Sequence, residues 1–220
     1  MPRCKRKEDD IIQTDVSEGR VIVYSFEEIK KQLKIQSGGK KPVVSVAAAA
    51  DADVLEAIKM MNDDGFGTAI LVGDADKIAT IADEIGCNLS ENTVVDIKDG
   101  TQAAQVAVAC AREGQADIVM KGLLHTKVYL KAILNREFGL RTGQLLNAVT
   151  AFELPNYNRM ALATDCGMII TPTLEDKVQM IGNATQLANA MGCERYLACL
   201  QLKRSTAICQ TVLMRRFSVR

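Results

Sequence analysis

The chain has 220 residues, and its 27 basic side chains are balanced by 27 acidic ones. This balance gives no reason to expect nucleic acid or an anionic membrane surface as a partner. Aromatic residues make up only 4% of the chain and Trp is absent, which argues against a stacking platform for single-stranded nucleic acid.

Seven cysteines are scattered through the chain without a CxxC pair, which favours reduced thiols and a cytoplasmic location. The first residues, MPRCKRKEDD, are charged and lack the apolar stretch of a signal peptide. No apolar run in the sequence is long enough to span a membrane, so no membrane partner is expected. Residues 1–22 mix charges without a period, and we expect a leader without fixed structure there, with no role assigned.

From Lys41 onward, short apolar runs alternate with stretches of helical period, the pattern of repeated βα units in an α/β fold. The predicted strands are Pro42–Ala47, Thr68–Gly73, Thr93–Ile97 and Asp117–Gly122. Right-handed crossovers between them would make the strands parallel in one sheet.

The helices between these strands carry signals for their ends. Asp53 and Glu56 predict a capping box at the start of the first helix. Glycines predict where three helices end: Gly65, Gly86 and Gly114.

A turn at Glu137–Gly143 introduces a second region of the chain. It contains predicted strands at Asn147–Leu154 and Met160–Thr164, a turn at Pro155 and Asn156, and a helix from about Leu174 to Met191. We therefore predict a first α/β domain at residues 23–140 and part of a second at residues 141–194.

Candidate binding residues follow the predicted strands and the glycine-bearing turn. In an open parallel sheet, ligands bind beyond the carboxyl ends of the strands, where helix N-termini favour anions. The candidates are cations, hydroxyls, a glycine, an aspartate and the chain's histidine: Lys121, Gly122, His125, Thr126, Arg141, Thr142, Thr164 and Asp165. Each also has a local explanation, such as a surface lysine, a helix cap or a strand-to-helix turn. The case for a site depends on several of these groups converging at one edge.

Other chemistries lack their sequence signatures. No GxGxxG follows the first strand and no Walker A motif occurs, which disfavours hydride transfer and P-loop nucleotide hydrolysis. One histidine and scattered cysteines do not offer the usual zinc spacings, so no metal site is predicted.

Four segments carry a family resemblance: ADIVMKGLLHT from Ala116, REFGLRTG from Arg136, ATDCGMIITP from Ala163 and LEDKVQMIGNA from Leu174. They resemble the phosphate acetyltransferase and butyryltransferase family, and its butyryltransferase branch most. The similarity runs from about Tyr24 to about Glu194.

The resemblance implies a two-domain α/β fold of the isocitrate/isopropylmalate-dehydrogenase type, incomplete at the C-terminus, and a homodimer. The implied reaction converts acyl-CoA and phosphate reversibly into acyl phosphate and free CoA, with butyryl or acetyl as the acyl group. Coenzyme A and phosphate are substrates, and no cofactor is implied. Five of the eight candidate residues would suit the phosphate and carbonyl end of the substrates: Lys121, His125, Thr126, Arg141 and Thr142.

The sequence departs from the family pattern in two places. Ile169 stands where the family pattern has an Asn, and no segment matches the family's Ser-Arg-Ala-Asp-Ser-like motif near its C-terminus. The catalytic residues are therefore unassigned, and impaired activity is expected. A non-catalytic fragment, or a CoA- or phosphate-binding protein with an incomplete cleft, remains the alternative.

Residues 195–220 differ in composition from the rest of the chain. The last twenty contain five Lys or Arg and no Asp or Glu. Moving the reading frame one base upstream permits the string AVEEVNRDMPDSVDAAVL, which resembles the family's continuation. We therefore interpret these residues as frameshifted, expect no packed structure in them, and expect an exposed edge on the parallel sheet. A basic tail that binds a membrane or nucleic acid is the competing interpretation.

Overall fold

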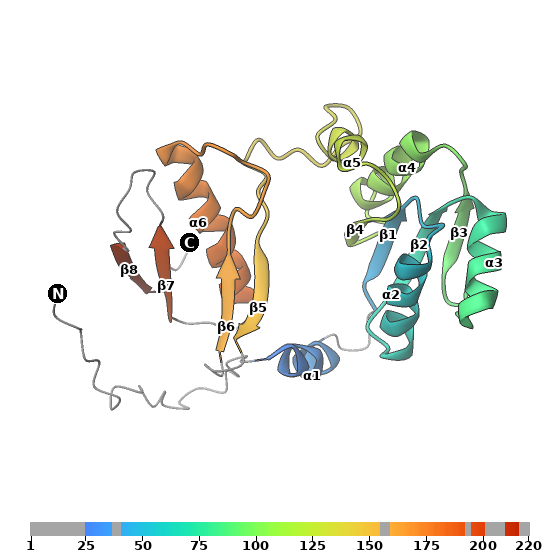
Figure 1. Ribbon diagram of the computed structural model, residues 1–220, viewed down its shortest axis with the longest axis horizontal. Coiled ribbons are helices and arrows are strands. Elements are labelled where there is room, and N and C mark those ends of the chain that lie inside the picture. Colours follow the sequence, from blue (N-terminus) through green and yellow to red (C-terminus); the bar gives the residue numbers. More distant parts are fainter. Residues whose placement is uncertain (1–24, 37–40, 155–158, 192–194, 201–209, 216–220) are drawn as a thin grey trace, which may run out of the picture. The chain divides into compact units, whose positions relative to one another are not determined.

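The computed structural model describes residues 25–36, 41–154, 159–191, 195–200 and 210–215 (Figure 1). The chain divides into two compact units. We call residues 30–144 the sheet unit, and residues 1–29 with 145–220 the hairpin unit. The division falls within α1 (Phe26–Gln36), whose first turn carries Glu27 and Glu28, the charge that a helix N-terminus favours.

The sheet unit contains the four parallel strands that the sequence predicted. They are β1 (Val43–Ala47), β2 (Thr68–Gly73), β3 (Thr93–Asp96) and β4 (Ile118–Lys121). Their order in the sheet is β3-β2-β1-β4 (Figure 1). β1 and β2 are central and mostly buried, which explains their mostly apolar sequences. β4 pairs with β1 alone among the described strands, which makes it an edge strand of the sheet, and its Ile118 is 51% exposed. The expected exposed edge stays a prediction.

Helices cover both faces of this sheet. α2 (Ala52–Asp63) and α3 (Ala75–Ile85) pack on one face through a cluster that includes Leu55, Ile58 and Ile78. α4 (Gly100–Arg112) and α5 (Thr126–Ile133) pack on the other face through small residues of α4 and Ala132 of α5. The Ala-rich face of α4 allows its backbone to approach the sheet closely.

The helix ends partly follow the sequence prediction. The capping box at Asp53 and Glu56 is wrong, because Asp51 is the N-cap and its side chain accepts from the Val54 amide at 3.2 Å. Asp51 has the extended backbone that a cap requires, whereas Asp53 already lies in the first helical turn. The three predicted helix ends are confirmed, since each glycine has a positive φ that L-residues adopt at a cost: Gly65, Gly86 and Gly114.

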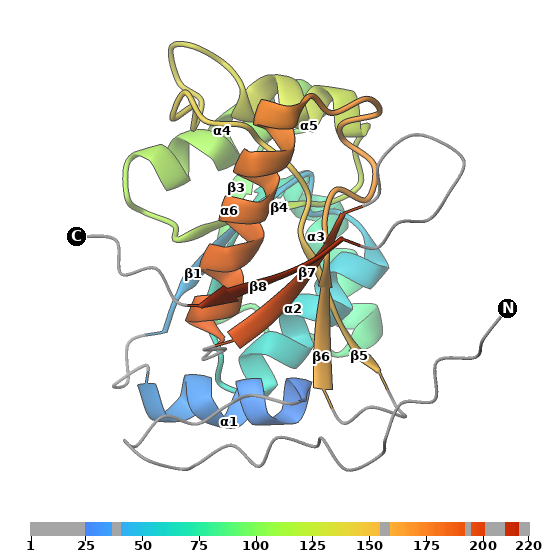
Figure 2. The same ribbon diagram turned by 90° about the vertical axis from the view of Figure 1, so that its left-hand side faces the viewer.

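The hairpin unit is built from two antiparallel strand pairs and a helix. β5 (Thr150–Leu154) pairs with β6 (Arg159–Ala163), with Thr150 opposite Ala163 (Figure 2). The turn predicted at Pro155 and Asn156 lies outside the described residues. α6 (Leu174–Ala190) confirms the predicted helix and begins with a capping box between Thr173 and Asp176.

Strand structure extends into the region that we interpreted as frameshifted. β7 (Arg195–Leu200) and β8 (Gln210–Arg215) form an antiparallel pair. The expectation of no packed structure is therefore wrong for these two segments, because their aliphatic and β-branched residues suit strand pairing whatever their origin. Residues 201–209 and 216–220 lie outside the described residues. Among the helices of the described ranges, none combines the length and apolarity needed to cross a membrane.

Candidate functional site

The loop from β4 to α5 is held against the end of β1 by backbone hydrogen bonds. The Gly122 amide donates to the Ala47 carbonyl at 2.8 Å, and the Leu123 amide donates to the Ala48 carbonyl at 3.0 Å. A Cβ atom at Gly122 would lie 2.2 Å from the Ala48 carbonyl oxygen, so only glycine fits this close approach. The fold therefore explains the glycine at this position by sterics, and the predicted role of Gly122 in substrate binding stays a prediction.

Ala48 has an unusual backbone conformation in this contact. Its φ is 58°, in the left-handed region that a residue with a Cβ adopts at a cost. The Ala48 carbonyl accepts from the Leu123 amide, which joins this residue to the β4–α5 loop. Left-handed non-glycine residues are concentrated at functional sites, and Ala48 is a feature that sequence reasoning missed. The run of four alanines gave no signal for it.

The N-terminus of α5 is open to an anion. His125 is the N-cap, but its side chain makes no capping hydrogen bond. Within the described ranges, no residue accepts from the amides of Thr126 and Lys127 at the start of the helix. By contrast, the carboxylates of Asp51, Asp74 and Asp99 cap the other three helices of the sheet unit.

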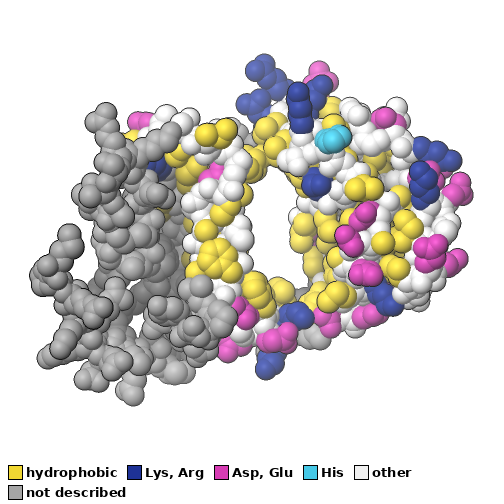
Figure 3. All heavy atoms as spheres, viewed as in Figure 1, with side chains coloured by type: hydrophobic (Ala, Val, Ile, Leu, Met, Phe, Trp, Pro, Cys, Tyr) yellow, Lys and Arg dark blue, Asp and Glu magenta, His cyan; other side chains and the backbone are white. Residues whose placement is uncertain are grey.

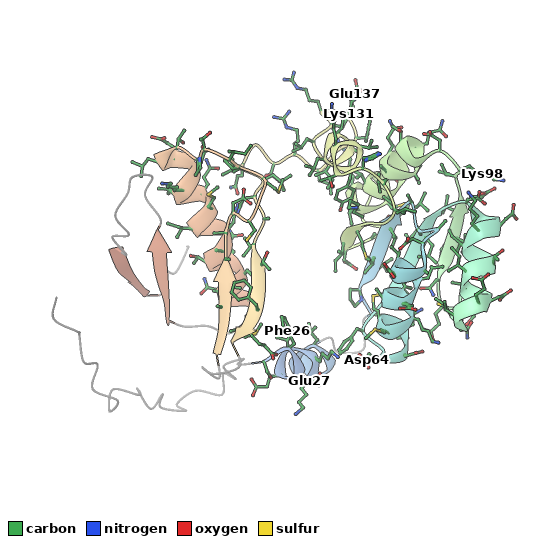
Figure 4. All side chains as sticks on the ribbon, in the orientation of Figure 1. Phe26, Glu27, Asp64, Lys98, Lys131 and Glu137 are labelled. Atoms are coloured by element: carbon green, nitrogen blue, oxygen red, sulfur yellow. The ribbon has the colours of Figure 1, made fainter. Side chains whose placement is uncertain are left out.

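Side chains around α5 carry positive charge. The Lys121 ammonium donates to the carbonyls of Gly122 and Leu124, both at 3.2 Å, which holds it at the loop. Figure 3 shows further Lys and Arg side chains over α5 and the loop that follows it. In Figure 4, Lys131 lies at the outer surface of this region together with Glu137. The local potential at α5 therefore favours an anion more than the neutral whole chain suggests.

α5 itself is tied to the sheet. The Tyr129 hydroxyl donates to the Val119 carbonyl of β4 at 2.8 Å. Burial raises the pKa of this phenol, so it remains a donor at neutral pH. The helix N-terminus is thereby positioned by contacts on both β1 and β4.

The loop with Arg141 and Thr142 has an anchored base and an exposed tip. Arg112 of α4 donates to the Gly139 carbonyl at 3.1 Å, and the Leu140 amide donates to Ile133 at 2.8 Å. A Cβ at Gly139 would lie 2.4 Å from two carbonyl oxygens, so glycine is required there as well. Arg141 and Thr142 follow this base and are exposed, with Thr142 accepting from the Gln144 amide at 3.4 Å.

Thr164 and Asp165 belong to the hairpin unit, at the end of β6. Asp165 accepts from the backbone amides of four residues: Ala148, Gly167, Met168 and Ile169. Burial pushes its pKa upward, but these hydrogen bonds outweigh burial and hold the pKa below the ordinary value of an aspartate. The carboxylate therefore organises its own loop, with the Ile169 amide as its shortest contact at 2.7 Å.

The Thr164 hydroxyl is part of an amide network that sequence reasoning also missed. Asn147 donates to Thr164 Oγ1 at 2.6 Å, and Asn183 of α6 donates to Asn147 Oδ1 at 2.5 Å. The sequence offered one signal for this network: Asn183 lies in the interior of the predicted helix, where asparagine has a poor helix propensity.

The candidates thus fall into two groups, six in the sheet unit and two in the hairpin unit. In the described part of the chain, no three Asp, Glu, His or Cys side chains are grouped to hold a metal ion. Cations, hydroxyls and free amides dominate the sheet-unit group, which suits an anion with several oxygen atoms.

All eight candidate residues lie within the part of the chain that matches a known family. Residues 100–206 match a family model described as "Phosphate acetyl/butaryl transferase". The phosphate butyryltransferase of Clostridium beijerinckii is 41% identical over 170 residues, which cover 77% of this chain and 55% of that protein. The chain belongs to the phosphate acetyl/butyryl transferase family. It spans about half the length of the curated relatives it matches.

Other known proteins resemble large parts of the chain. The phosphate acetyltransferase of Thermotoga maritima is 34% identical over 156 residues, covering 71% of this chain and 53% of that protein. A branched-chain phosphotransacylase from Enterococcus faecalis has 25% identity and a TM-score of 0.56 over 67% of this chain and 51% of that one. A phosphotransacetylase from Streptococcus pyogenes, 14% identical, covers 78% of this chain and 60% of that one, and supports the fold alone with a TM-score of 0.65.

Proposed function

We propose that this chain carries the phosphate-binding part of a phosphate acyltransferase, which interconverts acyl-CoA and phosphate with acyl phosphate and CoA. The observation that carries the proposal is the uncapped N-terminus of α5, which follows the loop that holds the Lys121 ammonium. Both lie within the region that matches the family. A phosphate or acyl phosphate would accept from the free amides of Thr126 and Lys127.

The other helix N-termini of the sheet unit are poor alternatives for this anion. Each is capped by a carboxylate that satisfies an amide and repels negative charge: Asp51, Asp74 and Asp99. The anion therefore fits best at α5, where His125 stands in the capping position in place of a carboxylate.

The reaction requires no covalent intermediate between substrate and protein. An oxygen of phosphate attacks the thioester carbon, a tetrahedral oxyanion forms, and the C–S bond breaks to release the CoA thiolate. Cations and hydroxyls such as Lys121, Arg141 and Thr142 would orient phosphate and offset the developing charge. We assign no catalytic residue, because no segment of this chain matches the Ser-Arg-Ala-Asp-Ser-like motif of the family.

Further parts of the proposal depend on the family resemblance or on composition. We infer a homodimer with no resident cofactor from the resemblance, since both reactants arrive as substrates, and a cytoplasmic location from the scattered cysteines. The acyl group is butyryl or acetyl, and one methylene changes pocket binding by only about 1–3 kcal/mol.

Mixing the chain with butyryl-CoA, with and without inorganic phosphate, tests the proposal through the appearance of free thiol. We expect thiol release that depends on phosphate and falls in a Lys121→Met variant. Lys98→Met is the matched control, because Lys98 is an exposed lysine before the N-terminus of α4. Phosphate binding without turnover would favour the binding-only alternative, and absence of both would contradict the proposal.

A further inference from the structure

Leu123 is a large apolar side chain that the β4–α5 loop leaves exposed. It is 69% exposed, whereas the next residue, Leu124, packs against the buried cluster of α4 and α5. The backbone explains the difference. The Leu123 amide donates to the Ala48 carbonyl at 3.0 Å, and the Leu124 amide donates to the Gly122 carbonyl at 3.0 Å. The two leucine side chains cannot exchange places unless these hydrogen bonds break.

The exposed leucine lies beside a cation. The Lys121 ammonium donates to the carbonyls of Gly122 and Leu124, both at 3.2 Å, and these two carbonyls flank Leu123 in the chain. An ammonium has three protons, and these bonds use two of them, which leaves the third for an anion. The free amides at the start of α5 belong to the same stretch of chain. An apolar surface and an anion-binding surface therefore adjoin within the sheet unit alone.

An acyl phosphate has the same arrangement of groups, because one carbonyl group joins its phosphoryl oxygens to its hydrocarbon chain. Inorganic phosphate has no apolar part, so phosphate binding alone gives no reason for an exposed leucine at this point. We propose that Leu123 contacts the hydrocarbon chain of the acyl group and contributes to the selection of its length. This inference rests on the proposed function for the anion site at α5. It adds a contact that the anion itself does not require.

The contact predicts how affinity depends on chain length. Complete burial of one methylene strengthens binding about fourfold. A single side chain covers only one side of the acyl chain, so Leu123 should contribute about twofold for each methylene. Butyryl is two methylenes longer than acetyl, and Leu123 should therefore favour butyryl about fourfold.

Alkylphosphonates test the contact, because they join a phosphoryl group to a hydrocarbon chain through a P–C bond that is stable in water. In equilibrium dialysis of the full chain, affinity should rise about twofold per methylene from methyl- to propyl- to pentylphosphonate. Leu123→Ala should remove most of this rise and leave the affinity for inorganic phosphate unchanged, since Lys121 and the α5 amides remain. Leu123→Met should retain the rise, because it keeps an apolar side chain of similar size.

Met60→Ala is the matched control for Leu123→Ala. Met60 is 65% exposed near the C-terminal end of α2, so it removes a comparable apolar surface outside the β4–α5 loop. The rise with chain length should be the same in Met60→Ala and in the unmodified chain.

A second measurement observes Leu123 itself. In a chain with 13C-labelled leucine methyl groups, the methyl resonances of Leu123 should shift with pentylphosphonate and much less with inorganic phosphate. Equal affinities of the unmodified chain for the three phosphonates, or a rise that survives Leu123→Ala, would overturn the inference and leave the anion site in place. If neither phosphate nor any phosphonate binds, the proposed function fails, and the contact assigned to Leu123 fails with it.

Discussion

Replacing Gly122 with alanine should disrupt the β4–α5 loop, because the fold leaves no room for the added methyl group. The new Cβ would lie 2.2 Å from the Ala48 carbonyl oxygen and 2.8 Å from that of Ala47. Both distances are far inside the van der Waals contact, and both obstacles are backbone. The loop must therefore move away from β1.

The cost follows from the contacts that this movement breaks. The hydrogen bonds from Gly122 to Ala47 and from Leu123 to Ala48 would be lost or stretched. Two such bonds at about 1 kcal/mol each, with about 1–3 kcal/mol for the overpacked backbone, give a loss of about 3–5 kcal/mol in the free energy of unfolding. With a urea m-value of about 1.5 kcal/mol/M, the unfolding midpoint should fall by about 2 M or more.

Alkylation of buried thiols measures the unfolding of this unit specifically. Cys87 and Cys110 are buried in the sheet unit, and burial raises the pKa of both thiols, so they react slowly while the unit is folded. Mass spectrometry of the labelled peptides across a urea series gives the midpoint. Gly100→Ala is the matched control, because a Cβ there meets no atom within 4 Å and lies in the first turn of α4. A Gly122→Ala midpoint equal to that of Gly100→Ala would refute the steric account.

Three further changes have defined outcomes. Ala48→Gly should stabilise the sheet unit by up to about 1 kcal/mol, because glycine adopts a φ of 58° without the Cβ penalty, and a lower thiol-alkylation midpoint would contradict this. Arg141→Lys should weaken phosphate binding in dialysis more than Arg136→Lys does, since an ammonium lacks the bidentate fork of a guanidinium, and equal effects would remove Arg141 from the site. Asp165→Asn should cost about 2–3 kcal/mol near neutral pH, because the amide loses charge-assisted bonds. The pKa of Asp165 is lower in the folded state than in the unfolded state. Its contribution to the free energy of unfolding is therefore present above the unfolded-state pKa and is lost as the pH falls through the folded-state pKa. Thermal unfolding followed by circular dichroism should show the stabilities of the unmodified chain and of Asp165→Asn converging below about pH 4.

The sequence was sufficient for the sheet unit because its two central strands, β1 and β2, are mostly buried. Runs such as Val43–Ala47 and Thr68–Gly73 are mostly apolar, and their spacing implies the crossover helices. Helix ends at glycine were equally predictable, since a positive φ is a local property of the residue. The cap at Asp51 was missed because Asp53 also offered a carboxylate, and the choice depends on backbone angles that the sequence does not show.

The candidate site was predictable only as a set of residue types near strand ends. Lys121 and Gly122 follow from the end of β4, and their positions agree with that prediction. The network from Asn183 to Thr164 was not predictable, because its members are 36 and 17 residues apart and meet only through tertiary structure. The same holds for Ala48, whose left-handed backbone is enforced by a partner loop more than seventy residues away in the chain.

The most direct test of the account is a titration of the 15N-labelled chain with inorganic phosphate, followed through backbone amide resonances. We predict saturable shifts at Thr126 and Lys127, the free amides at the start of α5, and much smaller shifts at the capped N-termini that follow Asp51, Asp74 and Asp99. Shifts confined to the capped termini, or no saturable shift at α5, would contradict the assignment of α5 as the phosphate site.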